Sequence, residues 1–143
     1  MHSIGFIYAI GAAIAWGLLY AIDQKILANT SPIIFMFVVF VVGAILLSPV
    51  VFSQNTALVS LFSLGKARLL LILCSVVLAI LANYMILASI QKLGASLASV
   101  LEISYPFFVF FFSFLIFGAE LNAYVLVGSI FIFLGSAIIM RFG

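Results

Sequence analysis

The sequence of 143 residues has very little charge: five Lys and Arg side chains and three Asp and Glu side chains, 6% in all. Because soluble domains carry about 25% charged residues, this composition excludes an ordinary soluble domain. The chain is instead 69% hydrophobic, and several of its apolar runs approach the ~20 residues that a membrane-spanning helix needs. We therefore expect an all-α integral membrane protein that crosses a cell's inner or plasma membrane several times.

Cysteine and histidine are also nearly absent, with Cys74 and His2 as the single examples. One cysteine excludes an intramolecular disulfide and any metal site built from several cysteines. The sequence contains no nucleophile–base pair, glycine-rich phosphate loop or cluster of metal ligands. We therefore expect no catalytic residues, no metal and no cofactor, and we predict that the chain is not an enzyme. A net charge of +2 is too small to indicate nucleic-acid binding.

Turn-forming residues divide the chain into segments that predict five membrane-spanning helices, at about residues 3–28, 32–52, 66–91, 95–118 and 122–141. Ser31 and Pro32 form a start signal, a capping hydroxyl followed by proline at the first helical position. Gly94 is expected to end the third helix in the left-handed conformation. Asn122 can cap the fifth. We expect one five-helix domain over residues 1–143.

The fourth expected helix holds Glu102, the one carboxylate placed well inside an apolar run. Pro106 has no N–H to bond the carbonyl of Glu102, so the helix should bend there. Ser99, Glu102, Pro106 and Ser113 follow helical spacing and are expected to form one polar stripe. Because an acid in lipid is costly and usually lies on a pathway or against a partner helix, we expect this helix to line the functional site.

The first expected helix offers aromatic side chains at a matching depth, since Trp16, Tyr20 and Asp23 share one face. Trp16 lies ~20 Å from the start of its helix, and Glu102 lies ~10 Å from the start of a helix that runs the other way. In a ~30 Å hydrocarbon core these depths coincide. An indole beside a carboxylate could hold an organic cation or an amine-bearing metabolite, and Glu102 is the candidate for coupling to protons.

Six polar or aromatic residues are candidates for substrate binding: Trp16, Tyr20, Asn83, Ser99, Glu102 and Tyr105. A structural role for Glu102 remains open, in which Ser99 or another helix satisfies the carboxyl group or water hydrates it near the membrane surface. Asp23 and Lys25 lie near a membrane surface and are expected to anchor the end of the first helix.

Gly128 and Gly135 are seven residues apart on one face of the fifth expected helix. Small residues on one face allow two helix backbones to approach closely. The pair indicates either tight packing inside the subunit or a contact between two subunits, and the sequence leaves both open.

Positive charge gives almost no orientation signal. With the amino terminus in the cytoplasm, Lys66 and Arg68 face the cytoplasm, whereas Lys25, Lys92 and Arg141 face outward. Positive residues near the ends of spans normally fix orientation. One possibility is that a small excess of positive charge, or an insertion signal other than charge, decides the orientation. The other is that the chain inserts both ways and pairs with its own inverted copy. Two chains would then form the arrangement that duplicated transporters form from one.

Several short motifs occur in a fixed order: Ala15-Trp16-Gly17, then Lys25, Ser96-Leu97-Ala98-Ser99, Tyr105-Pro106-Phe107, Phe117-Gly118-Ala119-Glu120 and the pair Gly128 and Gly135. The ordered set resembles an EamA-type unit of the drug/metabolite transporter superfamily and covers essentially the whole chain. The usual EamA protein carries two such units and ten helices, whereas this chain corresponds to one. The related four-helix small multidrug resistance proteins work as inverted dimers and carry their acid in the first helix, where this chain has Trp16 and no acid until Asp23.

The resemblance implies an EamA-like bundle of five helices that acts as a secondary transporter of a small metabolite or drug. It implies alternating access and a homodimer, parallel or antiparallel, in the lipid bilayer. Two alternatives remain: a non-transporting membrane subunit of a larger complex, and half of a flippase for a lipid-linked carrier. By the same resemblance Glu120 is a structural turn residue at a helix end.

Overall fold

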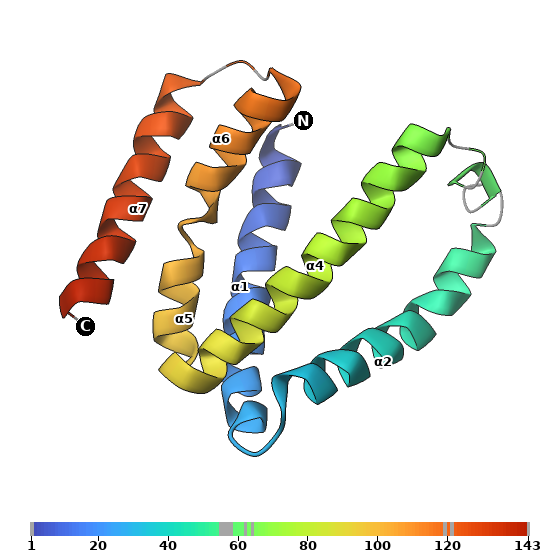
Figure 1. Ribbon diagram of the computed structural model, residues 1–143, viewed down its shortest axis with the longest axis horizontal. Coiled ribbons are helices and arrows are strands. Elements are labelled where there is room, and N and C mark those ends of the chain that lie inside the picture. Colours follow the sequence, from blue (N-terminus) through green and yellow to red (C-terminus); the bar gives the residue numbers. More distant parts are fainter. Residues whose placement is uncertain are drawn as a thin grey trace. The chain divides into compact units, whose positions relative to one another are not determined.

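The computed structural model describes residues 2–54, 59–61, 63, 65–118, 120 and 122–142. Its main elements are α1 (His2–Leu27), α2 (Pro32–Ser53), α4 (Lys66–Leu93), α5 (Ala95–Glu102), α6 (Tyr105–Phe117) and α7 (Ala123–Phe142) (Figure 1). Within these residues five stretches are long and apolar enough to cross a membrane: Ile4–Leu27, Pro32–Ser53, Lys66–Leu93, Ala95–Phe117 and Ala123–Phe142. The expected all-α fold with five spans is thereby confirmed.

The chain divides into two compact units, Met1–Ile26 with Ser89–Gly143, and Leu27–Ala88. The first unit contains α1 up to Ile26, the last residues of α4, and α5, α6 and α7, whereas the second contains α2 and the rest of α4. The candidate site lies wholly in the first unit.

In the second unit, α2 begins at Pro32, as the sequence predicts, but the side chain of Ser31 makes no capping hydrogen bond. Proline needs no cap at this position, because it has no N–H to satisfy and its φ angle is already helical. The amide nitrogen of Asn83 donates to the carbonyl oxygen of Ala79 at 2.8 Å, one turn earlier in α4. This polar side chain therefore bonds to its own helix.

The fourth span is broken into α5 and α6, where the sequence predicts a single bent helix. Ile103 and Ser104 lie between the two parts. Ser104 N donates to the carbonyl of Leu101 at 3.3 Å, a tighter turn than the helical bond to Val100 would give. Pro106 explains the break, because its ring clashes with the carbonyl four residues earlier and it offers no N–H to that carbonyl.

Ser136 of α7 stabilises the broken span. Its side chain is 5% exposed, and its hydroxyl donates to the carbonyls of Val100, at 2.9 Å, and Ile132, at 3.0 Å. The carbonyl of Val100 is the one that the tight turn leaves without its helical partner, and lipid could not supply a replacement. Phe107 packs on Phe133 with ring centroids 5.4 Å apart, so α7 contacts both α5 and α6 (Figure 1).

The small residues of α7 that face the bundle are serines. Ser129 is 3% exposed and Ser136 is nearly as buried, and both donate to carbonyls of their own helix. A Cβ built on Gly128 or Gly135 would meet no other described atom within 4 Å beyond its own helix backbone. Their neighbours Ser129 and Ser136, about 100° further around the helix, occupy the packed face instead, which favours the second of the two open alternatives, a contact between subunits. That contact stays a prediction.

Gly118 ends α6 in the left-handed conformation, with φ 60° and ψ 30°, and its N–H donates to the carbonyl of Phe114 at 3.0 Å. A side chain at this position is strained, so Gly118→Ala should lower the free energy of unfolding by about 1 kcal/mol. Thermal unfolding in detergent measures this effect. The matched control is Gly5→Ala in α1, where a Cβ meets open space and alanine should be neutral or stabilising. Equal loss of stability in both variants would contradict the strain argument.

Candidate functional site

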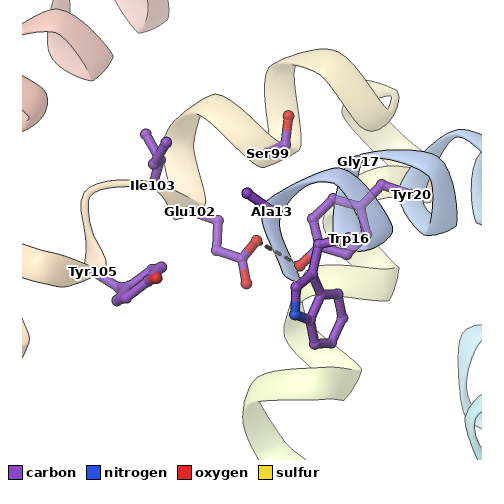
Figure 2. A pocket seen from close by; sticks show the side chains of 8 residues that line it. All are labelled: Ala13, Trp16, Gly17, Tyr20, Ser99, Glu102, Ile103 and Tyr105. Atoms are coloured by element: carbon purple, nitrogen blue, oxygen red, sulfur yellow. Dashed lines mark hydrogen bonds between the residues drawn. The ribbon is translucent and has the colours of Figure 1, made fainter. Parts of the chain in front are cut away.

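A cavity of about 420 Å³ lies between α1, α5 and the start of α6 (Figure 2). It is lined by Ala13, Trp16, Gly17, Tyr20, Ser99, Glu102, Ile103 and Tyr105. Small-molecule sites commonly occupy ~300–1,000 Å³ and combine apolar walls with a few convergent polar groups. Both conditions are met here, and every lining residue belongs to the first unit.

The acid of this cavity is held by an aromatic residue from another helix. The hydroxyl of Tyr20 donates to Glu102 Oε2 at 2.6 Å, and the two side chains point toward one another (Figure 2). The hydroxyl of Ser99 is not the partner, because it donates to the carbonyl of Ser96 at 2.9 Å. No other hydrogen bond to the Glu102 carboxyl is found in the described part of the chain. Oε1 therefore stays available to a ligand.

Trp16 forms the aromatic wall beside this acid. Its ring lies edge-on to Tyr20, with centroids 5.6 Å apart and an angle of 65° between the ring planes. The two residues are four apart on α1, which places them one turn from each other. Half of the Trp16 surface is exposed. The face of an indole attracts cations, and a nearby carboxylate adds to that attraction.

The break between α5 and α6 adds main-chain polarity at the same place. Three hydrogen bonds of the turn end on the carbonyls of Ser99, Leu101 and Ser104. None of the three ends on the carbonyl of Glu102, to which Pro106 has no N–H to offer. The carboxyl end of a helix carries partial negative charge. The carboxyl group, the indole and this helix end all favour a positively charged ligand.

The structure brings together five of the six predicted binding residues: Trp16, Tyr20, Ser99, Glu102 and Tyr105. Asn83 is the sixth; it lies in the other unit and is not among the lining residues. Their roles in substrate binding stay predictions. Ala13 and Gly17 also line the cavity, although they are not among the predicted binding residues. Ala13 precedes Trp16 by three residues and Gly17 precedes Tyr20 by three, a spacing that places each pair on neighbouring positions of the helix surface.

The polar stripe predicted for the fourth span is divided by the break. Ser99 and Glu102 line the cavity described above, whereas Pro106 and Ser113 line a separate cavity of about 300 Å³ that also includes Glu120. Asn122 lies at that second cavity too and caps α7 as predicted, since its Oδ1 accepts the N–H of Tyr124 at 3.0 Å.

Gln24 joins the end of α1 to the start of α5. Its Oε1 accepts the N–H of Ala95 at 2.7 Å. The preceding Gly94 has φ 83° and ψ 159°: the positive φ is as expected, but the backbone is extended and not left-handed helical. Glycine has no side chain with which to cap α5, so Gln24 takes that role and fixes α1 against the helix that carries Glu102.

Gln24→Ala should lower the free energy of unfolding by about 1 kcal/mol, because it leaves the Ala95 N–H at the helix start without its acceptor. The midpoint of thermal unfolding in detergent is the measurement. Gln54→Ala at the exposed end of α2 is the matched control and should change stability little. A Gln24 variant as stable as this control would show that the bond contributes nothing.

Asp23 departs from its expected role. Its side chain is 3% exposed, so it does not anchor the end of α1 among lipid headgroups. Its Oδ1 is buried without a hydrogen-bond partner in the described part of the chain. Lys25, two residues later, is exposed, as an anchoring residue should be.

The five apolar spans, together with the cavity between α1, α5 and α6 of the first unit, define an integral membrane protein of the transporter class. The family model described as the EamA-like transporter family matches residues 3–141, so the chain belongs to that family. The resemblance drawn from the ordered motifs is confirmed by this match. Comparison with curated proteins and with solved structures gave no match.

Proposed function

We propose that the chain is a secondary transporter that exchanges a small organic cation, an amine or quaternary ammonium compound, for protons across the inner or plasma membrane. One observation carries the proposal: Glu102, held by Tyr20 at 2.6 Å, lines a cavity that Trp16 also lines. A carboxylate supplies the countercharge and an indole supplies a cation-binding face. Acids placed inside membrane spans commonly mark substrate or proton pathways.

Cation transport is coupled to proton transport because the cation and the proton bind in turn to the same carboxyl group. The cation binds when Glu102 is ionised, and a proton replaces the cation before the site turns to the other side. The hydrogen bond from Tyr20 fixes the carboxyl in both steps, because the phenol donates to either form. A discontinuous span at the site, here α5 and α6, is typical of secondary transporters that work by alternating access.

We further propose that two copies form the working transporter, in parallel or antiparallel arrangement. One unit of five spans corresponds to half of the usual ten-helix EamA protein, and a second copy supplies the other half. Gly128 and Gly135 leave open space along α7, where a second helix could approach closely. The nearly balanced positive charge at the span ends supports the antiparallel form.

Vesicles that contain only this chain test transport directly. With an acidic interior, labelled benzyltrimethylammonium should accumulate inside as protons leave, and vesicles without protein should not accumulate it. A non-transporting subunit would give no flux in any gradient. A lipid-carrier flippase would move a lipid-linked headgroup and leave benzyltrimethylammonium outside, so either result would overturn the proposal.

The dimer has its own test. Gly128→Leu combined with Gly135→Leu should convert the protein in detergent from dimer to monomer, measured by light scattering, because the leucines fill the open face. Gly5→Leu combined with Gly11→Leu in α1, where a Cβ also meets open space, is the matched control and should leave the dimer intact. Carboxyl-terminal reporter fusions that are seen on one membrane side only would exclude the antiparallel form.

A further inference from the structure

Asp23 is a second acid in a membrane span, and cation exchange at Glu102 does not use it. It is 3% exposed and its Oδ1 has no hydrogen-bond partner among the described residues. Lys25 on α1 and Lys92 at the end of α4 are both exposed. Among the residues that the structure describes, therefore, no basic side chain bonds to Asp23 Oδ1.

A buried carboxylate without a partner has two ways to avoid a large energetic cost. It can acquire a cationic partner, which Asp23 Oδ1 does not have among the described residues, or it can bind a proton and become neutral. An ionised acid left uncompensated within a span costs several kcal/mol. The environment of Asp23 therefore accommodates the protonated carboxyl group.

Asp23 is also a helix neighbour of Tyr20, which lines the cavity. It follows Tyr20 by three residues on α1, so the two side chains are neighbours on the helix surface. Tyr20 bonds to Glu102 of α5 and lines the cavity with Tyr105 of α6, so it connects the surroundings of the two acids. Asp23 lies four residues before the end of α1 at Leu27, which is ~6 Å along the helix. It is therefore closer to water on that side than Glu102 is.

We infer that Asp23 is a second proton-binding group of the transport cycle, which holds a proton in this conformation and releases it to water when the carboxyl end of α1 opens. The O–H bond of the Asp23 carboxyl breaks, its proton passes to water, and the same carboxylate later takes a proton back; no other bond changes. This inference rests on the proposed exchange at Glu102. With both acids in the cycle, two protons leave for each monovalent cation that enters, and transport moves net charge.

The first test is infrared difference spectroscopy of the purified full chain. The sequence has only three side-chain carboxyl groups, Asp23, Glu102 and Glu120, so the carbonyl stretch of a protonated acid can be assigned by substitution. The comparison is made in the Glu102→Gln background, because Glu102 also binds a proton in the proposed cycle. At neutral pH that band should be present in Glu102→Gln, lost when Asp23→Asn is added and retained when Glu120→Gln is added. A band that persists after Asp23→Asn is added, or is absent from Glu102→Gln, overturns the inference. Thermal unfolding of Asp23→Asn, which is nearly isosteric, checks that the variant is folded.

The second test measures whether transport moves net charge across the membrane of vesicles with an acidic interior. An interior-positive potential set with potassium and valinomycin should accelerate uptake of benzyltrimethylammonium severalfold for the wild type and Glu120→Gln. For Asp23→Asn the exchange becomes one-for-one, and the potential should have no effect. A wild type insensitive to the potential, or a variant as sensitive as the wild type, overturns the inference. Absence of any flux in the wild type refutes the proposed function instead, and the infrared result then decides the protonation of Asp23 alone.

Discussion

Glu102→Gln should reduce pH-gradient-driven uptake of benzyltrimethylammonium to the level of vesicles without protein, and should weaken equilibrium binding of this cation about a hundredfold. The substitution keeps the size of the side chain and an oxygen that can accept the Tyr20 hydroxyl, which lies 2.6 Å from Glu102 Oε2 in the wild type. What is lost is the negative charge and the ability to bind a proton. The measurements are uptake in vesicles and calorimetric binding in detergent.

Glu120→Gln is the matched control, because Glu120 lies outside the cavity of Glu102 and lines a different one. It should bind and transport as the wild type does. Uptake by Glu102→Gln at the wild-type rate, with an unchanged dependence on pH, would contradict the coupling role. Binding that is retained while uptake is lost would leave Glu102 as a proton site and assign the cation to other residues.

Trp16→Ala should weaken binding of benzyltrimethylammonium about tenfold, since a desolvated cation–π contact contributes ~1–2 kcal/mol. Trp16→Phe should retain most of the affinity, because it keeps an aromatic face at the same position. Trp16 is half exposed and lies edge-on to Tyr20 at 5.6 Å. Its removal therefore opens the cavity wall without unpacking a buried core. Calorimetric binding in detergent is again the measurement.

The matched control for Trp16 is Phe6→Ala, an exposed aromatic residue on the same helix that does not line the cavity. It should bind the cation with wild-type affinity. If Trp16→Ala binds as tightly as the wild type, the indole is only part of the wall. If Trp16→Phe is as weak as Trp16→Ala, the size of the indole and not its aromatic face contributes the affinity.

Much of the fold follows from local signals in the sequence. The length of the apolar runs predicts the five spans, Pro32 sets the start of α2 and Asn122 caps α7. The depths of Trp16 and Glu102, counted from the starts of two oppositely running helices, predict that both can line one cavity. These predictions depend on helix geometry alone, which a sequence specifies well.

Other features depend on which helices are neighbours, and periodicity does not specify that. The hydroxyl partner of Glu102 comes from α1 and not from Ser99. Likewise, Ser136 and not a glycine faces the broken span, because the carbonyl of Val100 needs a hydrogen-bond donor there. In both cases a polar group takes its hydrogen bond from another helix, because its own helix does not supply a donor and lipid cannot replace one. The burial of Asp23 also depends on which helices are its neighbours, and its position near the end of a helix does not predict it.

Carboxyl-carbon NMR of protein labelled at glutamate tests most directly whether the Glu102 carboxylate is the countercharge for a cation in this cavity. The chain has only two glutamates, Glu102 and Glu120, and therefore two resonances. Titration with benzyltrimethylammonium should move the Glu102 resonance, with saturation at the binding constant found by calorimetry, and leave that of Glu120 in place. A Glu102 resonance that does not respond while the cation is bound would show that the ligand binds elsewhere.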